Sequence, residues 1–267
     1  MMRVYAGGAG LAGPGLDGWN ASRDVLAGRV PYRERPAQRR TPVLLPAAER
    51  RRSSATVHLA LQVTQEALEN AGLEDRGVAT VFASSGGDYD IIHQLCLALA
   101  APPRAVSPTR FHNSVHNAAA GYWSIAAGTH APSTALAGYD GTFAAGMLEA
   151  AAQVVIEGGP VLLVVYEQMP PEPLHAHRPV RGEFGAALLL TREREAGSLT
   201  ALDLDIEPVA GEAPSRMDDA GLEVLRCGNP AARALPLLAA LARAAPATVA
   251  LDYIDAQPLC VRCTPCR

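Results

Sequence analysis

The feature that most constrains the fold is residues 107–159, where a short apolar strand and a long helix meet at a tight turn. Residues 133–138 form a short apolar run between Pro132 and Gly138, which predicts a buried strand. Residues 113–128 and 143–157 are rich in alanine and predict helices, each of which ends at glycine. Residues 138–142, Gly-Tyr-Asp-Gly-Thr, must therefore form a sharp strand-to-helix turn that directs the N-terminus of the second helix at its surroundings.

Strands and helices alternate through residues 1–195. Apolar runs predict further strands at residues 4–13, 78–84, 160–166 and 182–191. Helical patterns lie between the strands, at residues 19–26, 55–70 and 89–100. This alternation predicts an α/β fold with three layers, α/β/α, and a five-stranded mixed sheet. Within this sheet, we expect residues 182–191 to be the antiparallel edge strand.

Residues 196–267 are predicted to form a second, shortened C-terminal part. They contain candidate strands at 201–208 and 248–254 and an Ala- and Leu-rich helix at 230–244. We expect the tail, residues 257–267, to be flexible. The chain therefore divides into a complete N-terminal unit, residues 1–195, and a reduced segment of strands and helix, residues 196–267.

Composition excludes several classes of function. The chain has 267 residues, of which 49% are apolar, so it can bury a substantial core. Its net charge of −4 argues against general nucleic-acid binding. No apolar run approaches the ~20 residues of a membrane span, and the N-terminus lacks the apolar region of a signal peptide. The odd number of cysteines, five, is typical of a reducing compartment. We expect a cytoplasmic protein without nucleic-acid or membrane partners.

Residues 8–13 match the glycine pattern GxGxxG of dinucleotide-binding loops. That function requires a helix that starts in the loop and an acidic residue at the end of the next strand. Here Pro14 and Gly15 interrupt the pattern, and the later region carries Arg33 and Arg35 instead of an acidic residue. The sequence therefore favours a simple strand-to-loop transition, and we expect no bound cofactor.

Histidines and cysteines occur at spacings that metal sites also use. His112 and His116 lie four residues apart, so one helical face would present both, but no third ligand is evident. The C-terminal pattern CxxCxxC resembles half of a zinc or iron–sulfur site, with Cys227 as the remaining candidate ligand. A terminal tail with reduced cysteines explains the pattern better. Cys96 lies on the apolar side of its predicted helix, and we expect it to be a small core residue. We therefore expect no metal. The thiols of the CxxCxxC pattern are those of Cys260, Cys263 and Cys266.

The organising segment resembles the active-site half of the β-ketoacyl synthases, the condensing enzymes of fatty acid and polyketide synthesis. The resemblance rests on Ser107-Pro108, Asn117, Ala120-Gly121, Ile125, Gly128 and Pro132-Ser133. It implies a thiolase-like fold in which the nucleophilic cysteine of the family occupies the turn 138–142.

The turn departs from the family at its most important position. The position of the family's cysteine falls on Asp140, flanked by Gly138, Tyr139, Gly141 and Thr142, and the turn contains no cysteine. The two histidines that the family carries later in the chain are also missing, because no histidine follows residue 195. We expect Asp140 to cap the following helix rather than to act in catalysis.

In lacking this cysteine, the chain resembles the chain length factors, which are ketosynthase-like proteins that pair with an active ketosynthase. Short proteins of this kind occur in aryl polyene systems. The resemblance implies a catalytically inactive subunit of a heterodimer or heterotetramer that shapes the acyl tunnel of its partner. The segment that would cross the interface and close the tunnel comprises Arg110, Phe111, His112, Ser114, His116 and Asn117.

Three alternatives remain open from the sequence. The chain is either such a partner, a stand-alone acyl-thioester transferase or hydrolase that uses Asp140 or a histidine, or a homodimeric acyl-binding scaffold. Acyl carrier protein is a further candidate partner, because several arginines could form a basic face, although a solvated loop explains them as well. These arginines are Arg33, Arg35, Arg39, Arg40, Arg50, Arg51 and Arg52.

Overall fold

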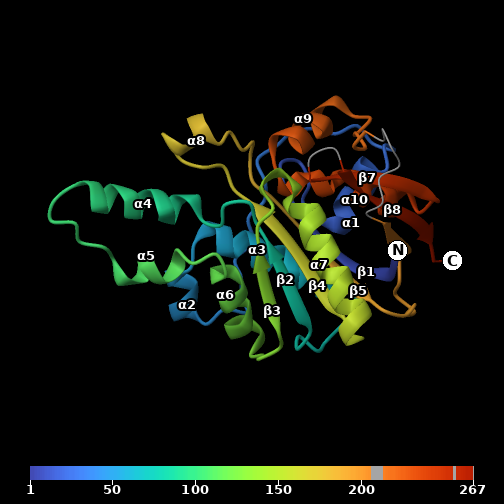
Figure 1. Ribbon diagram of the computed structural model, residues 1–267, viewed down its shortest axis with the longest axis horizontal. Coiled ribbons are helices and arrows are strands. Elements are labelled where there is room, and N and C mark those ends of the chain that lie inside the picture. The colour runs from blue at the N-terminus through green and yellow to red at the C-terminus, as the bar shows by residue number, and fades with distance from the viewer. Residues whose placement is uncertain (206–212, 255–256, 267) are drawn as a thin grey trace.

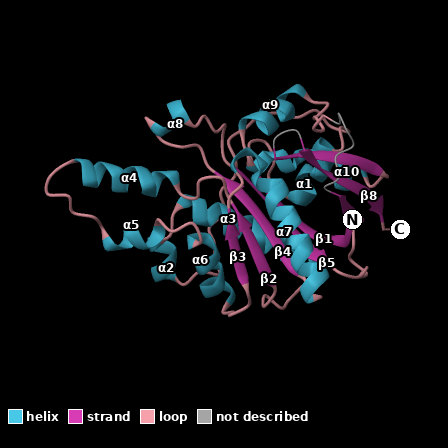
Figure 2. Cartoon of the chain, in the orientation of Figure 1, coloured by secondary structure: helices cyan, strands magenta, loops and turns pink. Residues whose placement is uncertain are grey.

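The computed structural model describes residues 1–205, 213–254 and 257–266. The described strands form one eight-stranded sheet in the order β3-β2-β4-β5-β1-β6-β8-β7. Helices cover both of its faces (Figures 1 and 2). None of the helices in these ranges is long and apolar enough to cross a membrane.

The first five strands of this order belong to the N-terminal unit and form the expected mixed sheet. They are β3 (Ser133–Leu136), β2 (Ala79–Ala83), β4 (Val161–Glu167), β5 (Phe184–Thr191) and β1 (Met2–Ala12). Strand β2 pairs in parallel with β3 and β4, and β5 runs antiparallel to β4 and β1.

Two expectations about individual strands are wrong. Strand β5 is internal rather than at an edge, because β1 pairs with its other side, and all eight of its residues are buried. Strand β3, predicted to be buried, lies at the edge of the sheet, and none of its four residues is fully buried. Burial within this chain therefore does not explain why the strand is apolar.

The C-terminal part extends the same sheet, so that it has eight strands rather than five. Strand β6 (Thr200–Asp205) pairs with β1, and β8 (Gln257–Pro265) lies between β6 and β7 (Ala247–Ile254). The tail expected to be flexible is thus a strand that buries Leu259 and Val261. Residues 206–208 of the predicted strand 201–208 lie outside the described residues.

The predicted helix at 230–244 is a 3-10 turn, η2 (Ala231–Ala234), followed by α10 (Leu235–Arg243). The sequence reasoning missed α9 (Ala220–Gly228), which begins where the Asp219 carboxylate accepts hydrogen bonds from the N–H groups of Gly221 and Leu222.

The three layers follow from the alternation of side chains along the strands. On one face, Phe82 and Leu162 pack in the same cluster as α3 (Ala55–Ala71) and α6 (Ala118–Ala127). On the other face, Val81 and Leu163 pack in the same cluster as α7 (Thr142–Glu157), α10 and α1 (Trp19–Leu26). The three-layer α/β/α arrangement is confirmed.

The glycine pattern of residues 8–13 serves helix packing. Gly8 and Gly10 lie within β1, and a Cβ atom on either would collide with a backbone carbonyl oxygen of α3, that of Ala67 or of Val63. Glycine therefore lets α3 approach β1 closely. No helix starts within the pattern, so the geometry of a dinucleotide-binding loop is absent from this described segment.

The helix predicted at 113–128 is α6, which begins at residue 118 rather than 113, and a separate short helix, α5 (Pro108–Asn113), precedes it. Helix α4 (Tyr89–Ala100) and α5 project from the body as an arm, called here the α4–α5 arm (Figure 1). No residue of α4 is buried, and Cys96 is exposed. The expectation that Cys96 lies in the core is wrong, because α4 leaves the sheet rather than covering it.

Candidate functional site

The turn between β3 and α7 has the geometry expected of a nucleophile elbow. It contains the 3-10 turn η1 (Tyr139–Gly141), in which Tyr139 has a φ of 52°, a left-handed conformation that is uncommon for a non-glycine residue. The Thr142 hydroxyl donates to the Tyr139 carbonyl oxygen at 2.6 Å and accepts from the Gly138 N–H at 3.1 Å. A single side chain thus holds both ends of the turn.

Asp140 does not cap the helix, so that prediction is wrong. Neither η1 nor α7 begins with a side-chain cap. The Asp140 carboxylate instead forms an ion pair of 2.7 Å with Arg178 and lies 3.8 Å from the guanidinium of Arg233. Arg233 also pairs with Asp252 of β7 at 2.6 Å. Two cationic side chains from distant segments stabilise the negative charge of the carboxylate more strongly than the helix N-terminus alone would.

Arg178 follows α8 (Leu174–His177) and lies directly against the elbow. Its guanidinium carbon is 3.8 Å from the centroid of the Tyr139 ring, a cation–π contact. The same guanidinium donates a hydrogen bond of 3.4 Å to the Ser85 hydroxyl, which follows β2. Sequence reasoning missed Arg178, because nothing local in the sequence connects a Pro-rich loop to a turn that precedes it by almost forty residues.

A buried carboxyl group lies at the end of the neighbouring strand. Glu167 ends β4, is fully buried, and accepts hydrogen bonds from the Ser85 N–H at 2.7 Å and the Ser84 hydroxyl at 3.4 Å. Burial raises the pKa of Glu167 to about 7. Because β2, β3 and β4 are parallel, their carboxyl ends meet at one edge, and this polar cluster and the elbow lie there together. An acidic residue directly after six apolar ones was the signal for Glu167.

The two histidines expected on one helical face are separated by the end of α5. His112 lies in α5 and is exposed, whereas His116 lies in the following loop, where its Nε2 is 2.9 Å from the Ser84 carbonyl oxygen. No group of three metal-ligating side chains occurs in the described ranges. Cys260 and Cys263 lie three residues apart on β8 and hence face opposite sides of the sheet.

The segment expected at a partner interface divides into two parts. Phe111, His112 and Asn117 line an apolar groove of about 490 Å³ on the outer side of α5 and α6. Its other lining residues are Pro108, Val115, Ala118, Gly121, Tyr122 and Ile125. Outside the groove lining, Arg110 is exposed, the Ser114 hydroxyl donates to the Phe111 carbonyl oxygen, and His116 reaches the end of β2.

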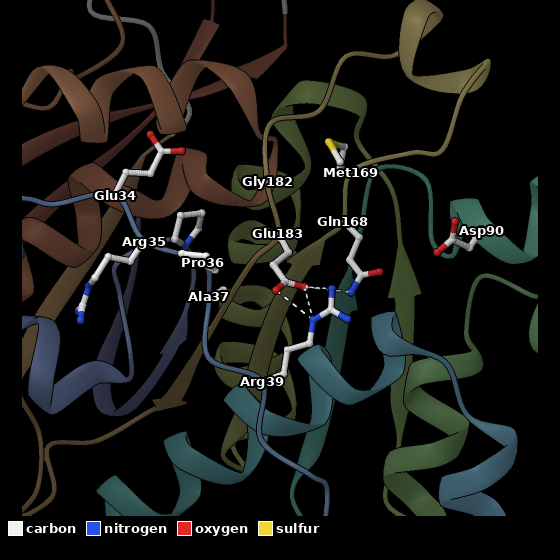
Figure 3. A pocket seen from close by; sticks show the side chains of 11 residues that line it. Glu34, Arg35, Pro36, Ala37, Arg39, Asp90, Gln168, Met169, Gly182 and Glu183 are labelled. Atoms are coloured by element: carbon white, nitrogen blue, oxygen red, sulfur yellow. Dashed lines mark hydrogen bonds and ion pairs between the residues drawn. The ribbon is translucent and has the colours of Figure 1, made fainter.

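A second hollow of about 470 Å³ opens where β4 ends and β5 begins (Figure 3). Arg39 and Glu183 form an ion pair of 2.8 Å across it, beside the side chain of Gln168. Arg35 pairs with Asp17, and Arg52 pairs with Glu49. Three of the arginines proposed as a basic face are therefore partly neutralised by carboxylates.

The sequence matches the model of the family described as "Beta-ketoacyl synthase, N-terminal domain" over residues 26–239. No curated protein matches it. Among solved structures, a ketosynthase in complex with its chain length factor from Xenorhabdus doucetiae is 21% identical, with a TM-score of 0.72 over 99% of this chain and 100% of that chain.

Two more structures share the fold at lower identity. The ishigamide ketosynthase/chain length factor is 14% identical, with a TM-score of 0.72 and full coverage of both chains (100%). A β-ketoacyl synthase from Burkholderia phymatum STM815 is 13% identical, with a TM-score of 0.62, over 91% of this chain but 71% of that one. The expected thiolase-like fold is confirmed, and the chain belongs to the β-ketoacyl synthase family through its N-terminal domain.

Proposed function

We propose that this chain is a catalytically inactive chain length factor, which pairs with an active β-ketoacyl synthase in the cytoplasm and shapes its acyl tunnel. The products would be polyketides, aryl polyenes or related fatty-acid-like chains. The observation that carries the proposal is an elbow that keeps the family's geometry without its thiol. Condensation requires a thiolate for acyl transfer and imidazoles for the carbanion-forming step.

The side chain at the elbow is a poor substitute for a nucleophile. The Asp140 carboxylate is held by Arg178 at 2.7 Å, so its negative charge is already compensated. An acyl group on a carboxylate would also form a labile mixed anhydride instead of a thioester. This geometry supports a subunit whose partner performs the chemistry.

The open edge of the sheet supports an interface. Among the described residues, β3 pairs with β2 alone, so its outer backbone groups are available to another strand. Beside this edge, the α4–α5 arm and α6 expose large apolar side chains, with Leu97 57%, Phe111 67% and Ile125 48% exposed. Apolar exposure next to an unpaired strand is typical of an obligate interface.

The extent of the structural likeness supports a reduced partner. The chain spans all of the matched chain in the Xenorhabdus doucetiae complex but 71% of the β-ketoacyl synthase from Burkholderia phymatum STM815. One chain of a ketosynthase–chain length factor complex is thus matched at full length, while the β-ketoacyl synthase from Burkholderia phymatum STM815 is not. Acyl carrier protein is the further partner we propose, and exposed Arg51 on α2 (Ala47–Arg52) offers a contact for its acidic surface.

The experiment is co-expression with the ketosynthase encoded beside this chain, followed by product analysis. Phe111, at the apolar groove, is the bulky side chain that we expect to limit tunnel length. Phe111→Ala should leave the complex intact and lengthen the products by at least one extension unit. The matched control Val224→Ala, an exposed side chain on α9, should leave both unchanged. Unchanged products and unchanged complex in Phe111→Ala would show that this residue does not shape the tunnel.

The remaining alternatives give different results in the same preparations. A homodimer that ignores the ketosynthase would indicate an acyl-binding scaffold that pairs β3 with its own copy. Turnover of an acyl thioester by the isolated chain, lost in Asp140→Ala, would indicate a stand-alone transferase or hydrolase.

A further inference from the structure

The loop between β4 and β5, residues 168–183, passes beside the elbow, and Arg178 is the loop residue that forms an ion pair with the elbow. This loop carries α8, which stands out from the body (Figure 1). Arg178 then turns inward, and its side chain is 19% exposed although the loop around it is largely at the surface. An arginine is held this far from solvent only where its charge and its N–H groups are satisfied.

Two separate elements satisfy Arg178. The elbow supplies the Tyr139 ring, 3.8 Å from the guanidinium carbon, and the Asp140 carboxylate at 2.7 Å. The end of β2 supplies the Ser85 hydroxyl at 3.4 Å. Ser85 is itself fixed, because its N–H donates to the buried Glu167 at 2.7 Å. The guanidinium is thus held between the elbow and the carboxyl end of the sheet.

This position is the one that a substrate would need. An acyl thioester that reacts at residue 140 must bring its carbonyl carbon against that side chain, and Arg178 already occupies one side of both the carboxylate and the adjoining ring. Arg233 and Asp252 lie on another side, where Arg233 is 3.8 Å from Asp140 and 2.6 Å from Asp252.

We infer that Arg178 is a plug that covers one side of the degenerate elbow and hinders the reaction of acyl thioesters at residue 140, although the Asp140 side chain is 45% exposed on its other sides. The plug slows acylation of the elbow even if a nucleophile is restored, which favours acylation at the partner's site. The biological role of the plug rests on the proposed function, whereas the contacts that form the plug are independent of it.

The test restores a thiol at the elbow and measures its accessibility. In Asp140→Cys, two reagents compete for the introduced thiol: iodoacetamide, which is small, and an octanoyl-pantetheine thioester, which is bulky. In the second reaction the thiolate attacks the acyl carbonyl carbon, a new protein thioester forms, and the pantetheine thiol leaves with a proton. Peptide mass spectrometry separates this site from exposed Cys96 and Cys227. Because both reagents need the thiolate, the ratio of their rates cancels changes in the thiol pKa.

The expected result is a ratio of bulky to small reagent that rises at least tenfold when Arg178→Ala is added to Asp140→Cys. The matched control is Arg181→Ala, in the same loop, whose guanidinium pairs with Glu34 rather than with the elbow. It should leave the ratio unchanged. Arg178→Gln, which keeps most of the side-chain length, should give an intermediate ratio and guards against misfolding of the alanine variant.

The inference is overturned if Asp140→Cys alone already reacts with the thioester at the ratio of the double variant, or if Arg181→Ala raises the ratio equally. The proposed function is tested separately, by the mass of the complex with the ketosynthase. A chain that forms the complex but lacks the plug, or has the plug but forms no complex, would be recognised as such.

Discussion

At the scale of single residues, Glu167 is an acid in an environment that disfavours its charge. It is fully buried at the end of β4, and its raised pKa of about 7 compares with 4.5 for an ordinary glutamate. Two hydrogen-bond donors, from Ser84 and Ser85, only partly offset the loss of water. The folded state therefore binds a proton between pH 4.5 and 7 that the unfolded state has released.

This difference predicts a stability that falls as pH rises from 4.5 to 7, since the folded state must give up its extra proton. By pH 7 and above, the group contributes a loss on the order of 3 kcal/mol. Glu167→Gln removes the titration, so its free energy of unfolding should change much less over this window. Urea unfolding at pH 5 and pH 7 checks this, with exposed Glu157→Gln as the control. A slope as steep in Glu167→Gln as in the wild type would contradict it.

The pH window in which Glu167 affects stability is separate from that of Glu223. A side-chain hydrogen bond from Arg226 lowers the pKa of Glu223 to about 2. A depressed pKa gives stability that is present above 4.5 and is lost as pH falls towards 2. Glu223 therefore contributes to acid unfolding below pH 4.5, as does Asp203, whose pKa the hydrogen bond from Arg3 also lowers, whereas Glu167 contributes in the interval above it.

The elbow also depends on one glycine. A Cβ atom on Gly141 would collide with the backbone carbonyl oxygen of Tyr253 in β7. Gly141→Ala must push the turn away from β7, and we expect a loss of about 2–4 kcal/mol. Thermal unfolding measures this against Gly159→Ala, where an added Cβ meets open space. Equal melting temperatures for the two variants would show that the contact is readily relieved.

At the scale of elements, the sequence predicts most of the helices and strands because their periodicity is local. The elbow, α7 and β4 lie where the apolar runs and the glycines indicate. The absence of the thiol was recognised for the same reason, because the sequence motif of the family is also local. Partnership between elements is not local, so β5 was misplaced at an edge, and the interior position of β8 was missed. Arg178 was missed because the loop that carries it has no pattern of its own.

The apolar sequence of α4 led to a wrong prediction of burial within the chain. Its side chains suggested burial, yet no residue of α4 is buried in the chain. An apolar helix that its own fold leaves exposed is best explained by a second protein, which is what the proposed heterodimer supplies. Under the proposed function, α4 would be buried in the assembly rather than in the isolated chain.

This explanation predicts a specific defect for Leu97→Glu on the α4–α5 arm. The side chain is 57% exposed, so the isolated chain should lose no more than about 0.5 kcal/mol of stability. The affinity for the ketosynthase should fall at least tenfold, because the charge would be buried at the interface. Calorimetric titration measures the affinity, and Val224→Glu on α9, 47% exposed, is the control. Equal affinities for both variants would place the arm outside the interface.

At the scale of the whole molecule, one sheet joins the two predicted parts. The C-terminal strands do not form a separate layer, because β6 pairs with β1, β8 pairs with β6 and β7, and α10 packs in the core beside α1 and α7. No sequence pattern distinguishes this continuation from an independent domain, because both need alternating strands and a helix. The final strand was interpreted as a reduced tail rather than as half of a metal site, because it lies at the C-terminal end of the sequence.

The buried position of β8 predicts a large effect of a core substitution near the end of the chain. Leu259 has no exposed surface, so Leu259→Ala should cost about 2–5 kcal/mol of the free energy of unfolding. Arg262→Ala, on the same strand but exposed, should cost less than about 0.5 kcal/mol. Denaturant unfolding of the two variants checks this, and similar midpoints would show that the strand contributes little to the core.

The measurement that most directly tests the central claim is the solution mass of this chain, alone and co-expressed with the neighbouring ketosynthase, by light scattering after size-exclusion chromatography. Our account predicts a stable complex with equal numbers of the two subunits, and a chain that self-associates or is poorly soluble when the open edge of β3 and the α4–α5 arm lack their partner. A well-behaved homodimer that does not bind the ketosynthase would contradict it.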